Sequence, residues 1–325
     1  MPNLRLSLAC WDYDRTRPLI DGRVQPEGID LDVSVLRPRE IFPRMLEHQD
    51  FDASEISLAS YATLVGRGTS PFVAIPVVVS KIFRHSGIYV RAGSGITRPE
   101  DLRGKRVGTT QISSTAVVFM KGLLEERYGV RQNEMRWVMG GLTAPTQAPL
   151  IPLNLPDDVE LTFLPSGETL EQQFEAGELD ALFSIYMPSA FLRGEPWVTR
   201  LFTDYRAREE AYFRDTKIFP IMHTVAISRA THEEHPWVAR SLYDAFVRST
   251  RLAIEDLYDS DALRVTLPWL LHHVEEAREV FGADFWRHGL KANEATWEAV
   301  GRFVHAQGLS PRVVRPGELF LPGFD

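Results

Sequence analysis

The hexapeptide CWDYDR, residues 10–15, gathers two acids, an arginine and two large aromatic rings directly after a predicted strand. Alternating leucines over residues 4–8 indicate that strand, and a short helix is expected over residues 16–22. A loop that joins a strand to a helix lies at the carboxyl end of an α/β sheet, where ligands bind in open folds. The hexapeptide is therefore either the first wall of a binding cleft or a helix start with solvated charges, in which Asp14 caps the helix.

Two arginines have the chemistry to bind a carboxylate, because a planar guanidinium can donate two parallel hydrogen bonds to it. They are Arg15 and Arg84, and each could instead form a structural ion pair, Arg15 with Asp12 for instance. His85 and His223 are expected where the chain crosses between two α/β halves, so both rings could face one cleft. Histidine titrates near neutral pH and suits proton transfer. The alternative is a hinge histidine that holds the backbone.

Glu55 follows a predicted short strand at residues 51–54 and so lies at a carboxyl end of the sheet. Its carboxylate could accept a proton there. It could equally favour the start of the following helix through the helix dipole. Ser54, Ser57 and Tyr61 are weaker hydrogen-bonding candidates beside it.

The composition is that of an ordinary folded protein. The 325 residues are enough for two lobes, and the net charge of −8 without a long basic run argues against binding to nucleic acid. The single cysteine, Cys10, excludes an intrachain disulfide, and we expect a buried thiol there, with a catalytic thiolate as the alternative. Residues 4–10 are too short and polar for a secretory signal, and no window approaches the roughly 18 apolar residues of a membrane span. We therefore expect a cytoplasmic protein with no membrane partner.

The order of the predicted elements indicates an α/β fold. Strands are expected at residues 4–10, 29–36, 51–56, 72–79, 88–91, 106–109, 159–164, 179–185 and from 222 to 227. Helices are expected between them at residues 16–22, 38–48, 58–66, 113–127 and 169–176. Residues 140–156 contain several prolines and glycines and are expected to form an extended loop.

The last third of the chain is predicted to be a layer of helices without strands. These helices are expected within residues 235–258, 262–271, 274–281 and 293–306. The tryptophans of this layer, Trp269, Trp286 and Trp297, offer apolar surface that could pack on the first lobe or on another subunit. A homo-oligomer is the expectation.

Two α/β halves with a first crossing near residue 85 and a later return suggest two lobes with a cleft between them. We expect lobe 1 to comprise residues 1–86 and 222–325, with the helical layer, and lobe 2 to comprise residues 87–221. This layout resembles that of the type II periplasmic-binding-protein fold.

The sequence of the second half strengthens that resemblance. PEDLRGKRVGTT followed by a helix, and then FEAGELDALFS, are similar to the second lobe of those proteins. In them the first helix of lobe 2 offers its N-terminal amides to a ligand carboxylate. The resemblance assigns this role to the helix start that carries Thr110, Ser114 and Thr115.

Further stretches extend a resemblance over essentially the full length. They are CWDYDR, FDASEISLASY, IPVVVSKIFRHSGIYV, GKRVGTTQISSTAVVFMKGLLEERYGV, FPIMHTVAISR, HPWVARSLYDAF and the closing GELFLP. In this order they resemble the 4,5-dihydroxyphthalate decarboxylase family. The resemblance implies a soluble decarboxylase whose partner is a small hydroxylated aromatic acid, 4,5-dihydroxyphthalate, which it converts to protocatechuate and carbon dioxide.

Such a reaction needs a carboxylate clamp, an acceptor at the phenol and a proton donor over the ring. Arg15 and Arg84 would form the clamp. Glu55 would accept the phenol proton. His223 is the first candidate for the proton donor, and His85 is the second.

The resemblance also implies different roles for the residues of CWDYDR. Trp11 and Tyr13 would form the floor under the substrate ring, while Asp12 and Arg15 would make polar contacts. Cys10 would pack behind them.

No cofactor is expected, because a hydroxyl para to the carboxylate can push electron density into the ring and no separate electron sink is needed. The alternative is a divalent metal held by His85, His223 and Glu55. A second function is also open: a cytoplasmic module, related to solute-binding proteins, that captures a small carboxylate without turnover. A third is a different lyase or hydrolase on the same scaffold.

Overall fold

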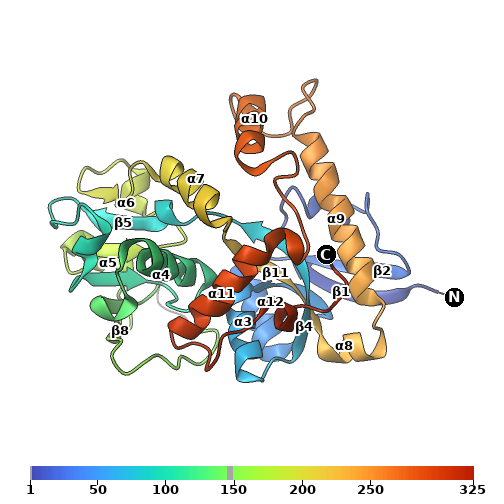
Figure 1. Cartoon of the computed structure of the whole chain (residues 1–325), viewed down its shortest axis with the longest axis horizontal. Coiled ribbons are helices and arrows are strands. Elements are labelled where there is room, and N and C mark those ends of the chain that lie inside the picture. The colour runs from blue at the N-terminus through green and yellow to red at the C-terminus, as the bar shows by residue number, and fades with distance from the viewer. Residues whose placement is uncertain (1, 145–148) are drawn as a thin grey trace.

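Two β-sheets form the framework of the computed structural model, which describes residues 2–144 and 149–325 (Figure 1). One sheet has the strand order β2-β1-β3-β11-β4 and the other has the order β10-β5-β9-β6-β7-β8. The strands are β1 (Leu4–Cys10), β2 (Ile29–Val35), β3 (Ala53–Ser57), β4 (Phe72–Lys81), β5 (Ile88–Arg91), β6 (Arg106–Thr109), β7 (Arg136–Met139), β8 (Leu161–Phe163), β9 (Ala181–Phe183), β10 (Val198–Arg200) and β11 (Ile221–Ser228). The predicted α/β class is confirmed.

Helices cover both faces of each sheet. They are α1 (Arg17–Ile20), α2 (Pro38–Pro43), α3 (Leu58–Arg67), α4 (Thr115–Tyr128), α5 (Leu170–Ala176), α6 (Ser189–Leu192), α7 (Tyr205–Thr216), α8 (Arg229–Glu234), α9 (Val238–Asp256), α10 (Leu270–Phe281), α11 (Glu294–Ala306) and α12 (Pro316–Leu319). A π-helical turn, η1 (Arg44–His48), continues α2, and short 3-10 turns are η2 (His85–Gly87), η3 (Pro99–Leu102), η4 (Gln132–Glu134) and η5 (Lys291–Asn293). No described helix is long and apolar enough to cross a membrane.

The first sheet combines the N-terminal strands with β11 from much later in the chain. β1 pairs in parallel with β2 and β3, whereas β11 runs antiparallel between β3 and β4. β4 is an edge strand and nearly continuous in apolar residues. Its outer edge is covered by the C-terminal segment, where the amides of Gly289 and Leu321 donate to the carbonyls of Pro76 and Ala74.

The second sheet is mixed. β6 pairs in parallel with β7 and β9, and β5 is antiparallel to β9 and β10. Apolar residues of α4 pack on one face of this sheet and those of α5 pack on the other. The carboxyl ends of β6 and β9 therefore lie side by side at one edge.

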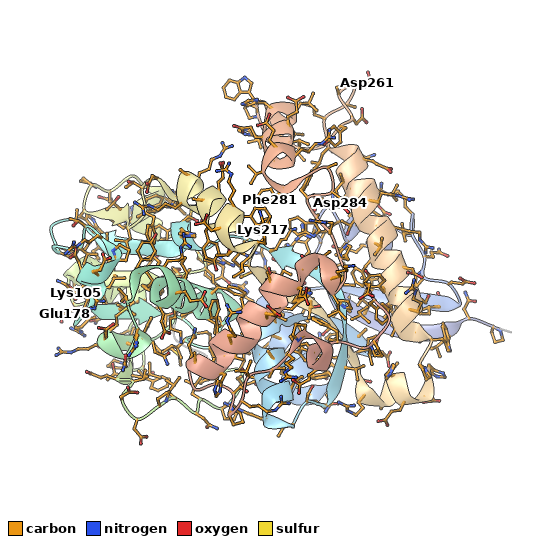
Figure 2. All side chains as sticks on the ribbon, viewed as in Figure 1. Lys105, Glu178, Lys217, Asp261, Phe281 and Asp284 are labelled. Atoms are coloured by element: carbon orange, nitrogen blue, oxygen red, sulfur yellow. The ribbon has the colours of Figure 1, made fainter. Side chains whose placement is uncertain are left out.

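The chain passes between the sheets twice, from β4 through η2 into β5 and from α7 back into β11. Phe83 and Phe219 stack at these crossings with centroids 4.3 Å apart, and Phe281 at the end of α10 lies 5.0 Å from Phe219. Phe281 also meets Phe213 of α7 edge to face at 4.7 Å, and Figure 2 labels Phe281 together with Lys217, which follows α7. The predicted lobe limits at 86/87 and 221/222 stay a prediction.

Helix α11 contacts elements of both sheets. It packs on α3 and on α4, and Phe119 of α4 meets Phe303 of α11 edge to face at 5.5 Å. Trp297 of α11 is completely buried against Phe320. The apolar core of the first sheet is thereby continuous with α4.

Some expected elements differ from the structure. The helix expected at residues 262–271 is wrong: Pro268 disfavours helix before it, Trp269 has a left-handed backbone with φ of 57°, and α10 begins only at Leu270. Strands β7 and β10 and helix α7 were not expected. The loop expected at residues 140–156 lies partly outside the described residues.

Candidate active site

The carboxylate of Glu55 is the centre of a buried hydrogen-bond cluster. His223 Nδ1 lies 2.5 Å from its Oε1, and the Tyr13 hydroxyl donates to the same oxygen at 2.7 Å. The other oxygen, Oε2, accepts from the Trp11 amide at 3.1 Å. Glu55 is completely buried, whereas the His223 side chain remains 19% exposed. One edge of the imidazole is therefore held by the protein while part of the ring reaches solvent.

Strand register brings Glu55 and His223 together. In the antiparallel pair of β3 and β11, Ser57 lies opposite His223 and Glu55 lies opposite Val225. Residues two apart on a strand share a face, so Glu55 is the diagonal neighbour of His223. β1 ends beside β3, and this places the loop that follows β1 over the same carboxylate.

Glu55 is ionised despite its burial. Burial raises the pKa of its carboxyl, but hydrogen bonds from His223, Tyr13 and the Trp11 amide outweigh that effect and hold the pKa below its ordinary value. An ionised carboxylate only accepts hydrogen bonds, so His223 Nδ1 is the donor and Nε2 is the nitrogen left for a ligand. A carboxylate in this position stabilises an imidazolium, whose Nε2 proton can be transferred.

These contacts change the role expected of Glu55. Both of its oxygens are occupied inside the protein, so it is not placed to take a proton from a ligand. It instead fixes the orientation and tautomer of His223. Phe42 also contacts His223: the two rings meet edge to face with their centroids 5.0 Å apart.

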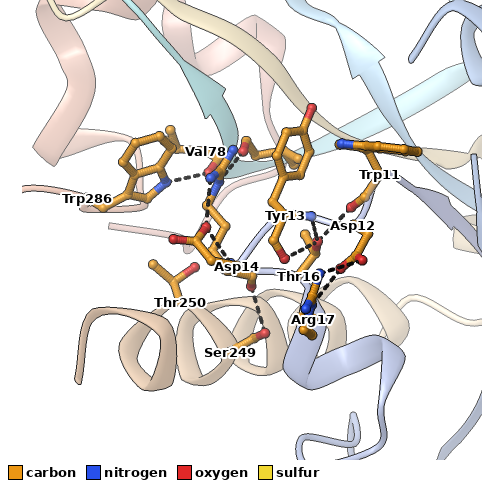
Figure 3. Close-up of polar contacts among 12 residues, drawn as sticks. Trp11, Asp12, Tyr13, Asp14, Thr16, Arg17, Val78, Ser249, Thr250 and Trp286 are labelled. Atoms are coloured by element: carbon orange, nitrogen blue, oxygen red, sulfur yellow. Dashed lines mark hydrogen bonds and ion pairs between the residues drawn. The ribbon is translucent and has the colours of Figure 1, made fainter. Parts of the chain in front are cut away.

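Trp11 and Tyr13 extend on the same side of their loop, away from Ser249 on α9 (Figure 3). The Arg37 guanidinium lies over the Trp11 ring at 4.7 Å. Tyr13 is pinned through its hydroxyl to Glu55, and burial raises the pKa of that hydroxyl, so it remains a neutral donor. The floor role predicted for the two rings stays a prediction.

Arg15 is largely engaged within the protein. Its Nε donates to the Val79 carbonyl and its Nη1 pairs with Asp14 at 3.0 Å. The guanidinium lies between two aromatic rings, 4.1 Å from the centroid of Tyr13 and 4.3 Å from that of Trp286. A ligand carboxylate would have to compete with these partners, and the clamp role of Arg15 stays a prediction.

Two of the alternatives left open for CWDYDR do not hold. Asp12 forms its ion pair with Arg17, at 2.6 Å, and not with Arg15 (Figure 3). Thr16 occupies the N-cap position of α1, while Asp14 accepts a hydrogen bond from the amide of Arg15. Cys10 lies buried behind this loop, and burial raises the pKa of its thiol, which disfavours a thiolate.

Arg84 has fewer partners than Arg15. Its Nε donates to the Met222 sulfur at 3.3 Å. The charge of Glu209 acts on the guanidinium, although no direct ion pair joins the two among the described residues. Burial lowers the pKa of its guanidinium to about 10. A half-buried guanidinium that makes no direct ion pair with its acid neighbour can still bind an anionic ligand.

His85 has contacts of its own, and none of them is with His223. Its ring is buried against Phe202 and Tyr212, and its Nδ1 is 3.7 Å from Glu209 Oε1 on α7. Neither of these two atoms has a hydrogen-bond partner among the described residues. Burial lowers the pKa of His85 to about 4 and raises that of Glu209 to about 7.

The structure therefore does not assemble the ligand set considered for a metal. Glu55 and His223 are in contact, but the recorded contacts of His85 are with residues of the second sheet region and α7. Within residues 2–144 and 149–325, no group of three or more His, Cys, Asp and Glu side chains is arranged to hold a metal ion.

Hydroxyl groups connect the two sheets beside this site. Ser57 Oγ, at the end of β3, lies 3.0 Å from Thr115 Oγ1, at the start of α4. Thr115 Oγ1 also accepts from the Ala59 amide at 3.0 Å. The starts of α3 and α4 are thereby joined, and Thr115 is a structural bridge between sheets as well as a predicted ligand contact.

The other predicted hydroxyl residues have different surroundings. Ser114 caps α4 by accepting from the Val117 amide. Thr110 is half-buried after β6. Ser54 is buried in β3, and its hydroxyl has no partner among the described residues.

Sequence reasoning missed Lys81, which ends β4. Its Nζ donates to the Phe285 carbonyl at 2.7 Å and lies 4.8 Å from the Trp286 ring, which also contacts Arg15. Burial lowers the pKa of the Lys81 ammonium to about 7. The sequence feature that could have identified Lys81 is its position as a lysine at the end of the apolar run FVAIPVVVSK.

Comparison with known proteins gives close relatives. The chain is 42% identical to the 4,5-dihydroxyphthalate decarboxylase of Comamonas testosteroni over 99% of this chain and 98% of the relative. It is 40% identical to the 4,5-dihydroxyphthalate decarboxylase of Pseudomonas putida over 66% of this chain and 83% of the relative. A family model described as NMT1/THI5 like matches residues 69–150.

A solved structure with a similar fold is the periplasmic aliphatic sulphonate binding protein SsuA from Escherichia coli. The TM-score is 0.53 at 14% identity, over 98% of this chain and 97% of that chain. This likeness confirms the predicted periplasmic-binding-protein-like fold.

Proposed function

The chain belongs to the 4,5-dihydroxyphthalate decarboxylase family, and on that premise we propose that it is a carboxy-lyase that converts 4,5-dihydroxyphthalate to protocatechuate and carbon dioxide. The observation that carries the proposal is the contact of Glu55 with His223, in which a buried carboxylate fixes one nitrogen of a partly exposed histidine. Non-oxidative loss of carbon dioxide from an aromatic ring requires a proton donor of this kind.

The reaction begins with protonation of the ring carbon that bears the departing carboxylate. A hydroxyl para to that carbon has by then given up its proton to solvent, and the resulting phenolate supplies the electron pair that forms the new C–H bond with the imidazolium Nε2 proton. The C–C bond to the carboxylate then breaks, its electron pair restores the aromatic ring, and carbon dioxide leaves. His223 is left neutral and regains a proton from solvent. Glu55 holds the imidazole ring in place and favours its charged form, so that a proton is present on Nε2 before transfer.

The substrate carboxylates are assigned to two places. Arg84 is a half-buried guanidinium whose acid neighbour Glu209 makes no direct ion pair with it, which supports a direct ion pair with the substrate. The start of α4 supplies backbone amides and the hydroxyls of Thr110 and Ser114, at the end of the helix that favours anions. Arg15 would strengthen the positive field from its place between Tyr13 and Trp286.

No cofactor is part of the proposal. The substrate ring accepts and returns the electron pair, so the residues need only bind, orient and transfer one proton. Activity that survives exhaustive dialysis against a metal chelator is the expected result. Recovery of lost activity by a divalent ion would contradict this part.

Cytoplasmic location and self-association also belong to the proposal. The apolar residues of Leu4–Cys10 form β1 of the first sheet, which supports a role in the fold for this segment. Trp269 is 79% exposed and is preceded by exposed Leu263, Val265 and Leu267, an apolar surface suited to a second copy of the chain. Light scattering should give a multiple of 36.9 kDa, and a Trp269→Ser variant should shift toward the monomer.

Purified protein and 4,5-dihydroxyphthalate test the main claim. Carbon dioxide and protocatechuate should appear in equal amounts without an added cofactor. In deuterated water the product should carry deuterium at the carbon that lost its carboxylate. Tight binding with neither product would contradict the proposal and favour the binding module.

A further inference from the structure

The segment after β9 exposes three large apolar side chains in succession. Ile185, Tyr186 and Met187 are 39%, 49% and 50% exposed, although every residue of the preceding strand, Ala181–Phe183, is buried. The exposure begins where the sheet ends, which is the position at which α/β sheets bind ligands.

The position of β9 aligns this segment with the start of α4. β9 runs parallel to β6, and Phe183 lies opposite Thr109. The chain therefore leaves both strands at the same edge, toward Thr110 in one case and toward Ile185 in the other. The carboxylate-binding amides assigned above and the three apolar residues belong to neighbouring loops.

This edge faces the residues proposed for catalysis. Thr115, which starts α4, is hydrogen-bonded to Ser57, and Ser57 lies opposite His223 in the first sheet. Ser184, directly after β9, donates from its amide to the Gly87 carbonyl at the crossing between sheets. The segment thus starts at the junction with the first sheet, beside the element that carries Arg84 and His85.

Both ends of the segment are anchored. The Tyr186 amide donates to Ser184 Oγ at 3.1 Å, which closes a tight turn. The amide and hydroxyl of Ser189 both donate to Glu171 Oε1 on α5, at 2.7 and 3.0 Å. A surface held at both ends presents its side chains at little further cost in conformational entropy when a ligand binds.

The first-sheet side of the site holds the reacting groups, and Trp11 and Tyr13 on that side are the predicted floor under one face of the substrate ring. An aromatic substrate also needs apolar contact with its ring, and a tyrosine ring and a methionine sulfur provide it with favourable geometry. We propose that residues 185–187 form the wall that binds the substrate ring and selects an aromatic over an aliphatic dicarboxylate. This inference rests on the proposed function and adds the determinants of its substrate class.

Variants Tyr186→Ala and Met187→Ala test the wall, with Leu192→Ala as the control because Leu192 is exposed on α6 of the same sheet region. Calorimetry gives the Kd of each protein for 4,5-dihydroxyphthalate and for cis-cyclohexane-1,2-dicarboxylate, which places two carboxylates on an aliphatic ring. Each wall variant should raise the Kd for the aromatic ligand about tenfold and leave the Kd for the aliphatic ligand unchanged. KM should rise by a similar factor while kcat changes less than about twofold.

The outcomes test the wall proposal independently of the proposed decarboxylation. The wall proposal would be overturned if both wall variants kept the wild-type affinity for the aromatic ligand. It would also be overturned if they lost affinity equally for both ligands. Either result would count even if the wild type releases carbon dioxide. Aromatic-selective loss in the wall variants would support it even if the wild type proves to be a binder without turnover. A wild type that binds the two ligands equally would overturn it as well.

Discussion

At the scale of residues, the account depends on a division of labour between Glu55 and His223. Glu55 is completely buried and makes its contacts inside the protein, so it acts through His223. The same separation of a buried carboxylate from an exposed imidazole organises serine-protease triads, where the acid fixes the tautomer and stabilises the imidazolium.

Replacing Glu55 by Gln should therefore reduce kcat by about 10²–10⁴ with little change in KM. Tyr13→Phe is the matched control, because it removes a hydrogen bond to the same Oε1 and keeps the charge, and about a tenfold loss is expected. Steady-state kinetics over a range of pH measures both. Equal losses in the two variants would argue against the charge of Glu55 as the active feature.

Substitution with Gln should have different effects at Arg84 and at Arg15. Arg84→Gln removes the guanidinium proposed to bind a substrate carboxylate, and we expect KM to rise about 10- to 100-fold. Arg15→Gln breaks contacts with Val79 and Asp14, so its main effect should be a lower Tm. If Arg84→Gln left KM unaltered, Arg84 would be a structural residue.

At the scale of elements, the crossings between sheets hold a second titrating pair, His85 of η2 and Glu209 of α7. Burial raises the pKa of Glu209 from 4.5 to about 7, so the folded protein binds this proton more tightly than the unfolded chain does. The stability that this group provides is complete below about pH 4.5 and is lost as the pH rises through 7.

The variant Glu209→Gln should remove this loss, because its amide does not ionise. Its free energy of unfolding should exceed that of the wild type by up to about 3 kcal/mol at pH 8, while the difference near pH 4.5 should be small. Denaturant titrations at the two pH values measure the difference. A variant less stable than the wild type at pH 8 would mean that the ionised carboxylate stabilises the crossing.

Individual strands were predictable because composition alone favours them. The valine-rich run that became β4 and the short β5 were found from apolar residues, and β5 was found to the residue. Pairing between distant strands carries no such local signal. A slip of one residue between β3 and β11 would place His223 on the other face from Glu55, so their contact could be proposed only as convergence at one edge.

That His85 and His223 face one cleft stays a prediction, because no recorded contact joins them. Both histidines lie near crossings, as expected, but His85 begins a turn toward the second sheet whereas His223 lies within β11 of the first. The position in the sequence predicted where in the fold each histidine lies, but it did not predict which way the side chain points. The helix expected at residues 262–271 failed because apolar periodicity outweighed Pro268 in the prediction.

At the scale of the whole molecule, α11 braces both sheets. An added Cβ at Gly122 of α4 would lie 2.6 Å from the Phe303 ring of α11. Gly122→Ala should force that contact apart and cost about 1–3 kcal/mol, which lowers Tm by a few degrees. Gly317→Ala is the control, since nothing lies within 4 Å of the added carbon. Calorimetric scans with equal Tm for both variants would contradict a bracing role for α11.

The central claim is that His223, held by Glu55, donates the proton that replaces the carboxylate. The most direct measurement compares wild type, His223→Asn and His85→Gln for both carbon dioxide release and affinity for 4,5-dihydroxyphthalate. The account predicts that His223→Asn loses about 10²–10⁴ in kcat while its Kd stays within a few-fold of the wild type, and that His85→Gln keeps most of its turnover. Undiminished carbon dioxide release by His223→Asn would contradict it.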